Sequence, residues 1–275
     1  LNETYGSGAA AAYSVRRLNG LYTGAAIQVE RSSDNTTQDI GFDANGDLDE
    51  SALTTFCTGT VCKVRTWYDQ SVTGGTGSGN DAVQTTHANQ PTIYTGGAIY
   101  KIEGRPAVKG LGTNGKLDFT TVSHTGNFSH YFVNTVQFPK MPYGGPSGNY
   151  YYQNSATQVR YQTSGTTETF SGYNFNTEQR VLTSANRGKT AGNLEVSIDG
   201  VENATAQPST DTFDVSMMYA GNGGGFWYQG YIQEFLLYDS SKSASDQDSI
   251  ESNIGDYFTQ NTPLLDTYTG AAAAY

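Results

Sequence analysis

The chain alternates apolar and polar residues over several short segments, which is the period of a β-strand that buries one face. These segments are residues 25–31, 63–68, 131–136, 157–161 and 194–198. A longer and more apolar segment, residues 230–238, predicts a late strand. Asp199-Gly200 directly follows one of these strands, and this pair favours a tight turn between antiparallel strands. The pattern therefore predicts a protein built mainly of β-strands.

Two segments have the period of an amphipathic helix instead. Residues 49–56 begin with an Asp cap and an acidic first turn, and they place Leu53 and Phe56 on one face. A second helix is predicted from Ser243 onward, with an apolar stripe of Ile250, Ile254 and Phe258. We interpret this stripe as core packing. Many strands and few helices favour a sandwich or jelly roll.

The surface is polar but weakly charged. Charged residues make up 15% of the 275 residues, well under the globular norm of about 25%. The net charge of −11 argues against nucleic acid or an anionic membrane as a partner. No apolar run approaches the roughly 20 residues of a membrane span, so membrane insertion is not expected. We predict an extracellular, cell-surface or virion-surface protein.

The only two cysteines are Cys57 and Cys62, separated by four residues with Gly59 among them. This spacing predicts a tight loop closed by a disulfide, which requires an oxidising compartment. Free thiols and half of a metal site are the alternatives. A metal site would need further ligands, and the three histidines are scattered along the sequence. We therefore predict no metal site here.

The two ends of the chain resemble each other. Gly8-Ala9-Ala10-Ala11-Ala12-Tyr13 recurs as Gly270-Ala271-Ala272-Ala273-Ala274-Tyr275, and an acidic-Thr-Tyr sequence precedes both. Coincidence between two alanine runs is the alternative to a true repeat. The match predicts one domain over residues 1–262, with residues 263–275 as a linker that starts the next copy. Neighbouring repeats of the same protein would then be its partners.

Several short motifs in the first half resemble a known family. They are residues 12–18, 31–35, 38–42, 57–62, 67–71 and 79–82. These motifs are similar to the catalytic domain of fungal-type α-L-arabinofuranosidases, the family 54 glycoside hydrolases. Residues 192–258 resemble the end of a laminin-G-like or concanavalin-A-like module. Related segments also occur in tandem-repeat phage, viral and secreted surface proteins.

The resemblance implies an all-β, concanavalin-A-like jelly-roll β-sandwich of two antiparallel sheets with two short helices. It also implies two catalytic carboxylates, because retaining glycosidases place two acids on either side of the scissile bond. The family has one of them in the glycine-rich loop that corresponds to residues 219–227, where Asn222 stands here. The other is a Glu on the strand that corresponds to residues 150–157, which contain no acid.

Neither Glu168 nor Glu178 matches the family motif, and the family's adjacent Cys-Cys pair is absent. We therefore expect no catalytic residue and lean against an enzyme.

Four first-half aspartates, Asp34, Asp39, Asp69 and Asp81, lie within or beside the matching motifs. We interpret them as turn residues that accept backbone hydrogen bonds, with Arg16, Arg17 and Arg31 as internal partners. Catalysis and Ca²⁺ binding are the alternatives for these carboxylates. No cofactor is predicted.

Aromatic residues in or beside glycine-rich loops predict a glycan site. Its candidate residues are Tyr143, Tyr150, Tyr151, Tyr152, Asn222, Phe226, Trp227 and Tyr228. Exposed rings stack on sugars, whereas the alternative is that these rings fill the core.

The sequence thus predicts a non-enzymatic surface module, a structural or adhesive unit that binds cell-surface or secreted glycans. A glycoside hydrolase of the arabinofuranosidase type is one alternative. A filament subunit assembled by exchange of terminal strands is another.

Overall fold

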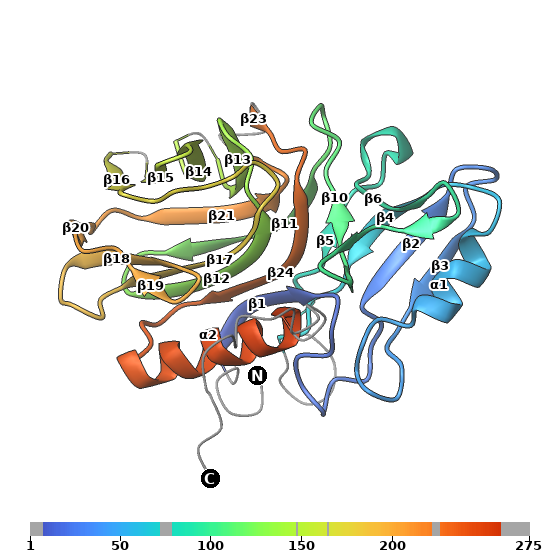
Figure 1. Ribbon diagram of the computed structural model, residues 1–275, viewed down its shortest axis with the longest axis horizontal. Helices are drawn as coiled ribbons and strands as arrows, with labels where there is room; N and C mark the ends of the chain where they lie inside the picture. The colour runs from blue at the N-terminus through green and yellow to red at the C-terminus, as the bar shows by residue number, and fades with distance from the viewer. Residues whose placement is uncertain (1–7, 72–78, 147, 164, 222–225, 260–275) are drawn as a thin grey trace, which may run out of the picture.

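The computed structural model describes residues 8–71, 79–146, 148–163, 165–221 and 226–259. Every strand pairing between the described residues is antiparallel. Two packed layers of strands form most of the molecule, and helix α2 (Ala244–Thr259) lies along one side (Figure 1). The predicted all-β sandwich with two helices is confirmed. None of the described helices is long and apolar enough to cross a membrane.

One layer has β12 (Phe128–Thr135) at its centre. β12 pairs with β17 (Arg180–Arg187) on one side and with β24 (Tyr231–Tyr238) on the other. Beyond these lie β18 (Asn193–Ile198) and β1 (Ala9–Ser14). All eight residues of β12 are buried, because strands flank it on both sides, the second layer covers one face and α2 lies near the other.

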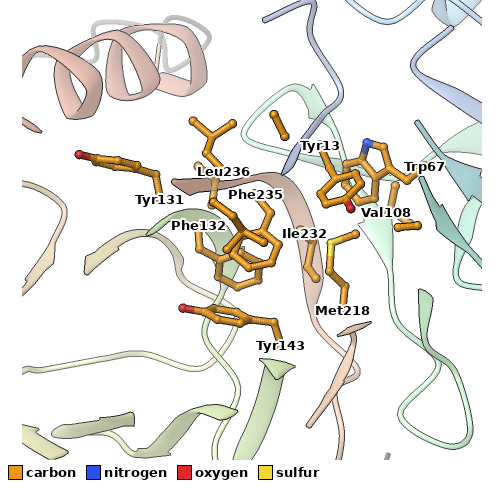
Figure 2. Packing of buried hydrophobic residues seen from close by; sticks show 14 of the residues in the cluster. Tyr13, Trp67, Val108, Tyr131, Phe132, Tyr143, Met218, Ile232, Phe235 and Leu236 are labelled. Carbon is orange, nitrogen blue, oxygen red and sulfur yellow. The ribbon is translucent and has the colours of Figure 1, made fainter. Parts of the chain in front are cut away.

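The second layer contains six strands, and each one pairs with the next in the following order. They are β11 (Leu117–His124), β21 (Phe213–Met218), β13 (Lys140–Gly144), β14 (Tyr150–Ser155), β15 (Gln158–Gln162) and β16 (Thr167–Ser171). Aromatic rings join the two layers. The Tyr143 ring lies 4.5 Å from Phe235 and 5.0 Å from Phe132, centroid to centroid (Figure 2).

The N-terminal strands extend the second layer sideways, at the right of Figure 1. They are β2 (Ile27–Arg31), β3 (Thr37–Ile40), β4 (Cys62–Trp67), β5 (Ala82–Val83), β6 (Thr92–Thr95) and β7 (Ala98–Ile99). β5 joins them to β11. β8 (Lys101–Ile102) and β9 (Arg105–Pro106) form a small hairpin, and β10 (Val108–Lys109) pairs with both β6 and β24.

Short two-residue strands complete the fold. β19 (Val201–Glu202) and β20 (Gln207–Pro208) pair with β18, and β22 (Ala220–Gly221) pairs with β23 (Phe226–Trp227). A 3₁₀ turn covers His87–Asn89. At the predicted hairpin, Asp199 and Gly200 have φ angles of 51° and 78°, as a tight turn with two positive φ angles requires.

Both predicted helices form, with ends shifted by about a residue. Helix α1 (Glu50–Cys57) is capped by Asp49, whose carboxylate accepts from the Ala52 amide at 2.9 Å. In α2 the stripe of Ile250, Ile254 and Phe258 is buried in the core. The disulfide between Cys57 and Cys62 is present and joins the end of α1 to β4.

Strand β1 lies outside the segments predicted as strands, because its alanines do not alternate with polar residues. Ala11, Ala12 and Tyr13 are nevertheless buried beside β24. The C-terminal copy of this sequence lies outside the described residues, so the predicted repeat boundary stays a prediction.

Candidate functional site

An acidic cleft opens among the N-terminal strands. It has a volume of about 330 Å³. Its lining residues are Tyr22, Gly24, Ala25, Asp39, Tyr68, Asp69, Gly79 and Asp81. The chain places them there because β2 pairs with both β3 and β4, which brings the end of β3 beside the residues that follow β4. Three carboxylates from distant positions in the sequence therefore meet in one cleft.

Asp69 forms the buried end of the cleft and has a structural role. Its carboxylate accepts from the backbone amides of Ala12 and Ser71, both at 2.9 Å, and from the Ser71 hydroxyl at 2.7 Å. The neighbouring Gln70 continues the anchor, because its side chain accepts from the Leu18 amide and donates to the Ser14 carbonyl. These contacts support the structural role that the sequence predicts for Asp69.

Asp81 lies beside Asp69 and is half-buried in the cleft. Its Oδ1 accepts from the Asp69 amide at 2.9 Å. Burial is the main cause that raises the pKa of Asp81, and the nearby Asp69 carboxylate raises it further. Asp81 therefore holds a proton more readily than an ordinary aspartate does, which is the property that a general acid needs.

Asp39 is exposed at the mouth of the cleft. Its Oδ1 accepts from the Tyr68 hydroxyl at 2.8 Å and from Gln28 Nε2 at 3.0 Å. Burial raises the pKa of Tyr68, and the hydrogen bond to Asp39 raises it further, so the phenol stays a donor. The Tyr22 hydroxyl donates to the Ala25 carbonyl at 2.9 Å, which fixes its ring as one wall.

The cleft thus combines a carboxyl of raised pKa with an exposed carboxylate. Two carboxyl groups in such different environments are the arrangement used for acid and base roles in glycoside hydrolysis. Asp39, Asp69 and Asp81 lie in the matching motifs of the sequence, whereas Tyr22 and Gln28 lie outside those motifs. Among the described residues, no group of three or more His, Cys, Asp or Glu side chains is arranged to hold a metal ion.

The predicted pairing of arginines with the first-half aspartates holds for Arg31 but not for Arg16. Asp34 caps a turn as predicted, since it accepts from the Thr36 amide at 3.1 Å and pairs with Arg31 at 2.9 Å. Arg16 pairs instead with Glu234 on β24 at 2.7 Å. This buried pair ties the end of β1 to the central layer.

The predicted glycan residues separate into two sets. Tyr143, Tyr151 and Tyr228 are buried in the core, so their rings are not available to a ligand. Tyr150, Tyr152, Phe226 and Trp227 are at least partly exposed. Asn222 lies outside the described residues. Tyr151 is buried while Tyr150 and Tyr152 are partly exposed, because successive residues of a strand point to opposite faces.

The stretch in which the family resemblance implies a catalytic Glu is β14 and the turn after it, and it carries no carboxylate. Glu168 is buried on β16, where burial raises its pKa. Glu178 lies in the turn before β17. Asp39, Asp69 and Asp81 of the N-terminal cleft, by contrast, share a pocket with Tyr22 and Tyr68.

Comparison with known proteins shows what the N-terminal part of the chain resembles. The family model described as "Alpha-L-arabinofuranosidase B, catalytic" matches residues 3–103. Alpha-L-arabinofuranosidase B of Emericella nidulans is 42% identical over 76 residues, which are 27% of this chain and 14% of that protein. The probable alpha-L-arabinofuranosidase B of Aspergillus flavus is 41% identical over the same length. The match thus spans about one seventh of the curated relatives.

Solved structures extend the likeness to nearly the whole chain. A GH54 α-L-arabinofuranosidase soaked with a cyclic sulfate inhibitor has a TM-score of 0.68 at 19% identity, covering 94% of this chain and 64% of that one. An arabinofuranosidase complexed with arabinofuranosyl-α-1,2-xylobiose has a TM-score of 0.62 at 17% identity, with the same coverage. The chain has the fold of these catalytic domains.

These matches correct two predictions. The expected non-enzymatic module is wrong, because the proteins that match in sequence and in fold are glycoside hydrolases. The description as a tandem-repeat structural protein also finds no support among them. The first-half motifs lie within the matched residues 3–103, whereas the two positions without acids lie outside them. An extracellular location agrees with the disulfide.

Proposed function

We propose that this chain is an extracellular glycoside hydrolase that acts on α-L-arabinofuranosides. One observation carries the proposal: every residue that lines the acidic cleft lies within residues 3–103, the segment that matches the arabinofuranosidase catalytic model. A cleft of about 330 Å³ has room for a single sugar ring and the linking oxygen.

In this proposal Asp81 is the general acid. Its raised pKa keeps the proton that must pass to the leaving oxygen as the glycosidic C–O bond breaks. Asp39 is the exposed carboxylate, and it attacks the anomeric carbon to form a glycosyl ester. Water then breaks this ester and gives its proton to Asp81. Tyr68 and Gln28 hold Asp39 in place through the two hydrogen bonds that it accepts. The assignment departs from the positions implied by family resemblance, because the described stretch there has no acid.

The test is release of nitrophenol from 4-nitrophenyl α-L-arabinofuranoside. Asp81→Asn and Asp39→Asn should each lower kcat at least about 100-fold, the size of an acid–base contribution. The activity of the wild type should fall as the pH rises through the raised pKa of Asp81, because the acid then loses its proton.

Asp34→Asn is the matched control, since it removes an aspartate of the same region outside the cleft, and it should leave kcat unchanged. Full activity in Asp81→Asn would overturn the acid assignment. A wild-type chain without turnover would overturn the proposed function itself.

A further inference from the structure

A second surface combines aromatic rings with an unpaired cation. β14, β15 and β16 lie side by side at the upper left of Figure 1. Along these strands alternate residues point inward, and Tyr151 and Tyr161 are buried there. Tyr150 and Tyr152 therefore share the outward face of the sheet. We call this surface the tyrosine face; it consists of Tyr150, Tyr152, Arg160 and Gln162.

Strand register fixes the spacing of the tyrosine face. Tyr152 lies directly opposite Arg160, and Tyr150 lies opposite Gln162. The two tyrosine rings are 6.1 Å apart between centroids and nearly perpendicular, at 82°. The Tyr150 hydroxyl donates to Gln162 Oε1 at 2.9 Å. A ring held in this way loses little conformational freedom on binding, so the face is preorganised.

The hairpin of β22 and β23 borders the tyrosine face. A Cβ atom on Gly221 would lie 2.9 Å from Tyr150 Cβ, so the backbone of β22 passes directly over that residue. Phe226, the partner of Gly221 in the hairpin, is 46% exposed. The hairpin beside the tyrosine face thus carries an exposed aromatic residue of its own.

Arg160 supplies the charge. Its guanidinium makes no ion pair and no hydrogen bond with any described residue, and its Nε is buried without a partner. The outward positions of β14, β15 and β16 carry only Tyr, Asn, Gln, Arg, Thr and Ser, so no carboxylate neutralises it on this face. Acidic residues outnumber basic ones in this chain, whose net charge is −11, yet none of the described acids pairs with Arg160.

We infer that the tyrosine face binds a carboxylated glycan, with the rings of Tyr150 and Tyr152 against the sugar and Arg160 on its carboxylate. Guanidinium matches a carboxylate in shape and forms charge-assisted hydrogen bonds with it. Tyrosine offers a large apolar surface with a polar tip, which suits a sugar ring. The inference is independent of the proposed hydrolysis, since the acidic cleft is lined by β3 and by the segments that precede β2, follow β4 and precede β5.

Calorimetric titration of the full chain with tetragalacturonate tests the inference. Arg160→Gln should weaken binding about tenfold or more, the loss expected for one charge-assisted hydrogen-bonding group. Tyr152→Ala should weaken it to a similar degree, and added salt should weaken binding to the wild type. Neutral maltotetraose should bind at least about tenfold more weakly than tetragalacturonate.

Lys109→Gln is the matched control. Lys109 is also a cation beside two tyrosine rings, at 5.1 and 5.2 Å from Tyr100 and Tyr231, but it lies on β10. Its removal should leave the titration unchanged. Equal affinity for the two oligosaccharides, or an unchanged titration in Arg160→Gln, would overturn the inference. Because Arg160→Gln should keep turnover of the aryl arabinofuranoside and Asp81→Asn should keep binding, the two proposals fail separately.

Discussion

At the scale of single residues, a chain of buried polar groups crosses the core. His130 Nε2 lies 2.8 Å from His124 Nε2, and the Tyr143 hydroxyl lies 3.3 Å from His130 Nδ1 and 2.8 Å from the Tyr161 hydroxyl. At the outer end, His124 Nδ1 lies 2.6 Å from Asp239 Oδ1. Every link can be satisfied when both imidazoles are neutral, with each hydroxyl or N–H donating toward Asp239.

These histidines should make the protein sensitive to acid. Burial lowers the pKa of His124 to about 4 and lowers that of His130 well below its ordinary value. Because the unfolded histidines protonate near pH 6.5, their contribution to stability is complete above that pH and is lost as the pH falls toward 4. Urea unfolding should show a free energy of unfolding at least about 2 kcal/mol lower at pH 4.5 than at pH 7.

A double variant that lacks both His124 and His130 is the control for this measurement. In His124→Asn/His130→Asn the difference between the two pH values should shrink, whereas His87→Gln should preserve it. An equal pH dependence in the double variant would assign the acid sensitivity to other groups.

At the scale of elements, close backbone approaches decide where strands meet. Gly110, just after β10, lies so near the second half that an added Cβ would be 2.2 Å from the Tyr228 carbonyl oxygen and 2.6 Å from the Tyr219 ring. Only glycine allows β10 to approach there, and β10 in turn pairs with β24. The glycine thus permits the contact between the N-terminal strands and the central layer.

Gly110→Ala should therefore lower the free energy of unfolding by about 1–3 kcal/mol, the usual cost of overpacking. Gly126→Ala is the control, because an added Cβ there meets no atom within 4 Å. Thermal unfolding of both variants checks this prediction. Equal melting temperatures would mean that β10 can move away from Tyr228 at little cost.

At the scale of the whole molecule, the two halves of the sequence are interlocked. β1 comes from the first residues of the described chain, yet it pairs with β24 near the other end. Arg16 reinforces this link through Glu234 and through the Tyr257 ring of α2, whose centroid is 4.6 Å away. The segment that matches the family model therefore does not contain all the partners of its own strands.

A fragment of residues 1–126 should consequently not fold alone. It lacks β24, so β1 and β10 would expose edges and apolar side chains. Circular dichroism should show a disordered fragment that gains β-structure when residues 127–275 are added. A cooperative unfolding transition in the isolated fragment would show that β24 is dispensable for the N-terminal strands.

The sequence by itself determined the features that depend on neighbours in the chain. The Asp49 cap, the Asp199-Gly200 turn, the stripe of α2 and the Cys57–Cys62 loop all follow from local periodicity and backbone geometry. Tertiary structure decided the rest. Whether Tyr151 or Tyr152 faces the core depends on which side of β14 is covered, and no local signal specifies that. Asp39 and Asp81 share a cleft only because β2 pairs with both β3 and β4, a long-range choice made by packing.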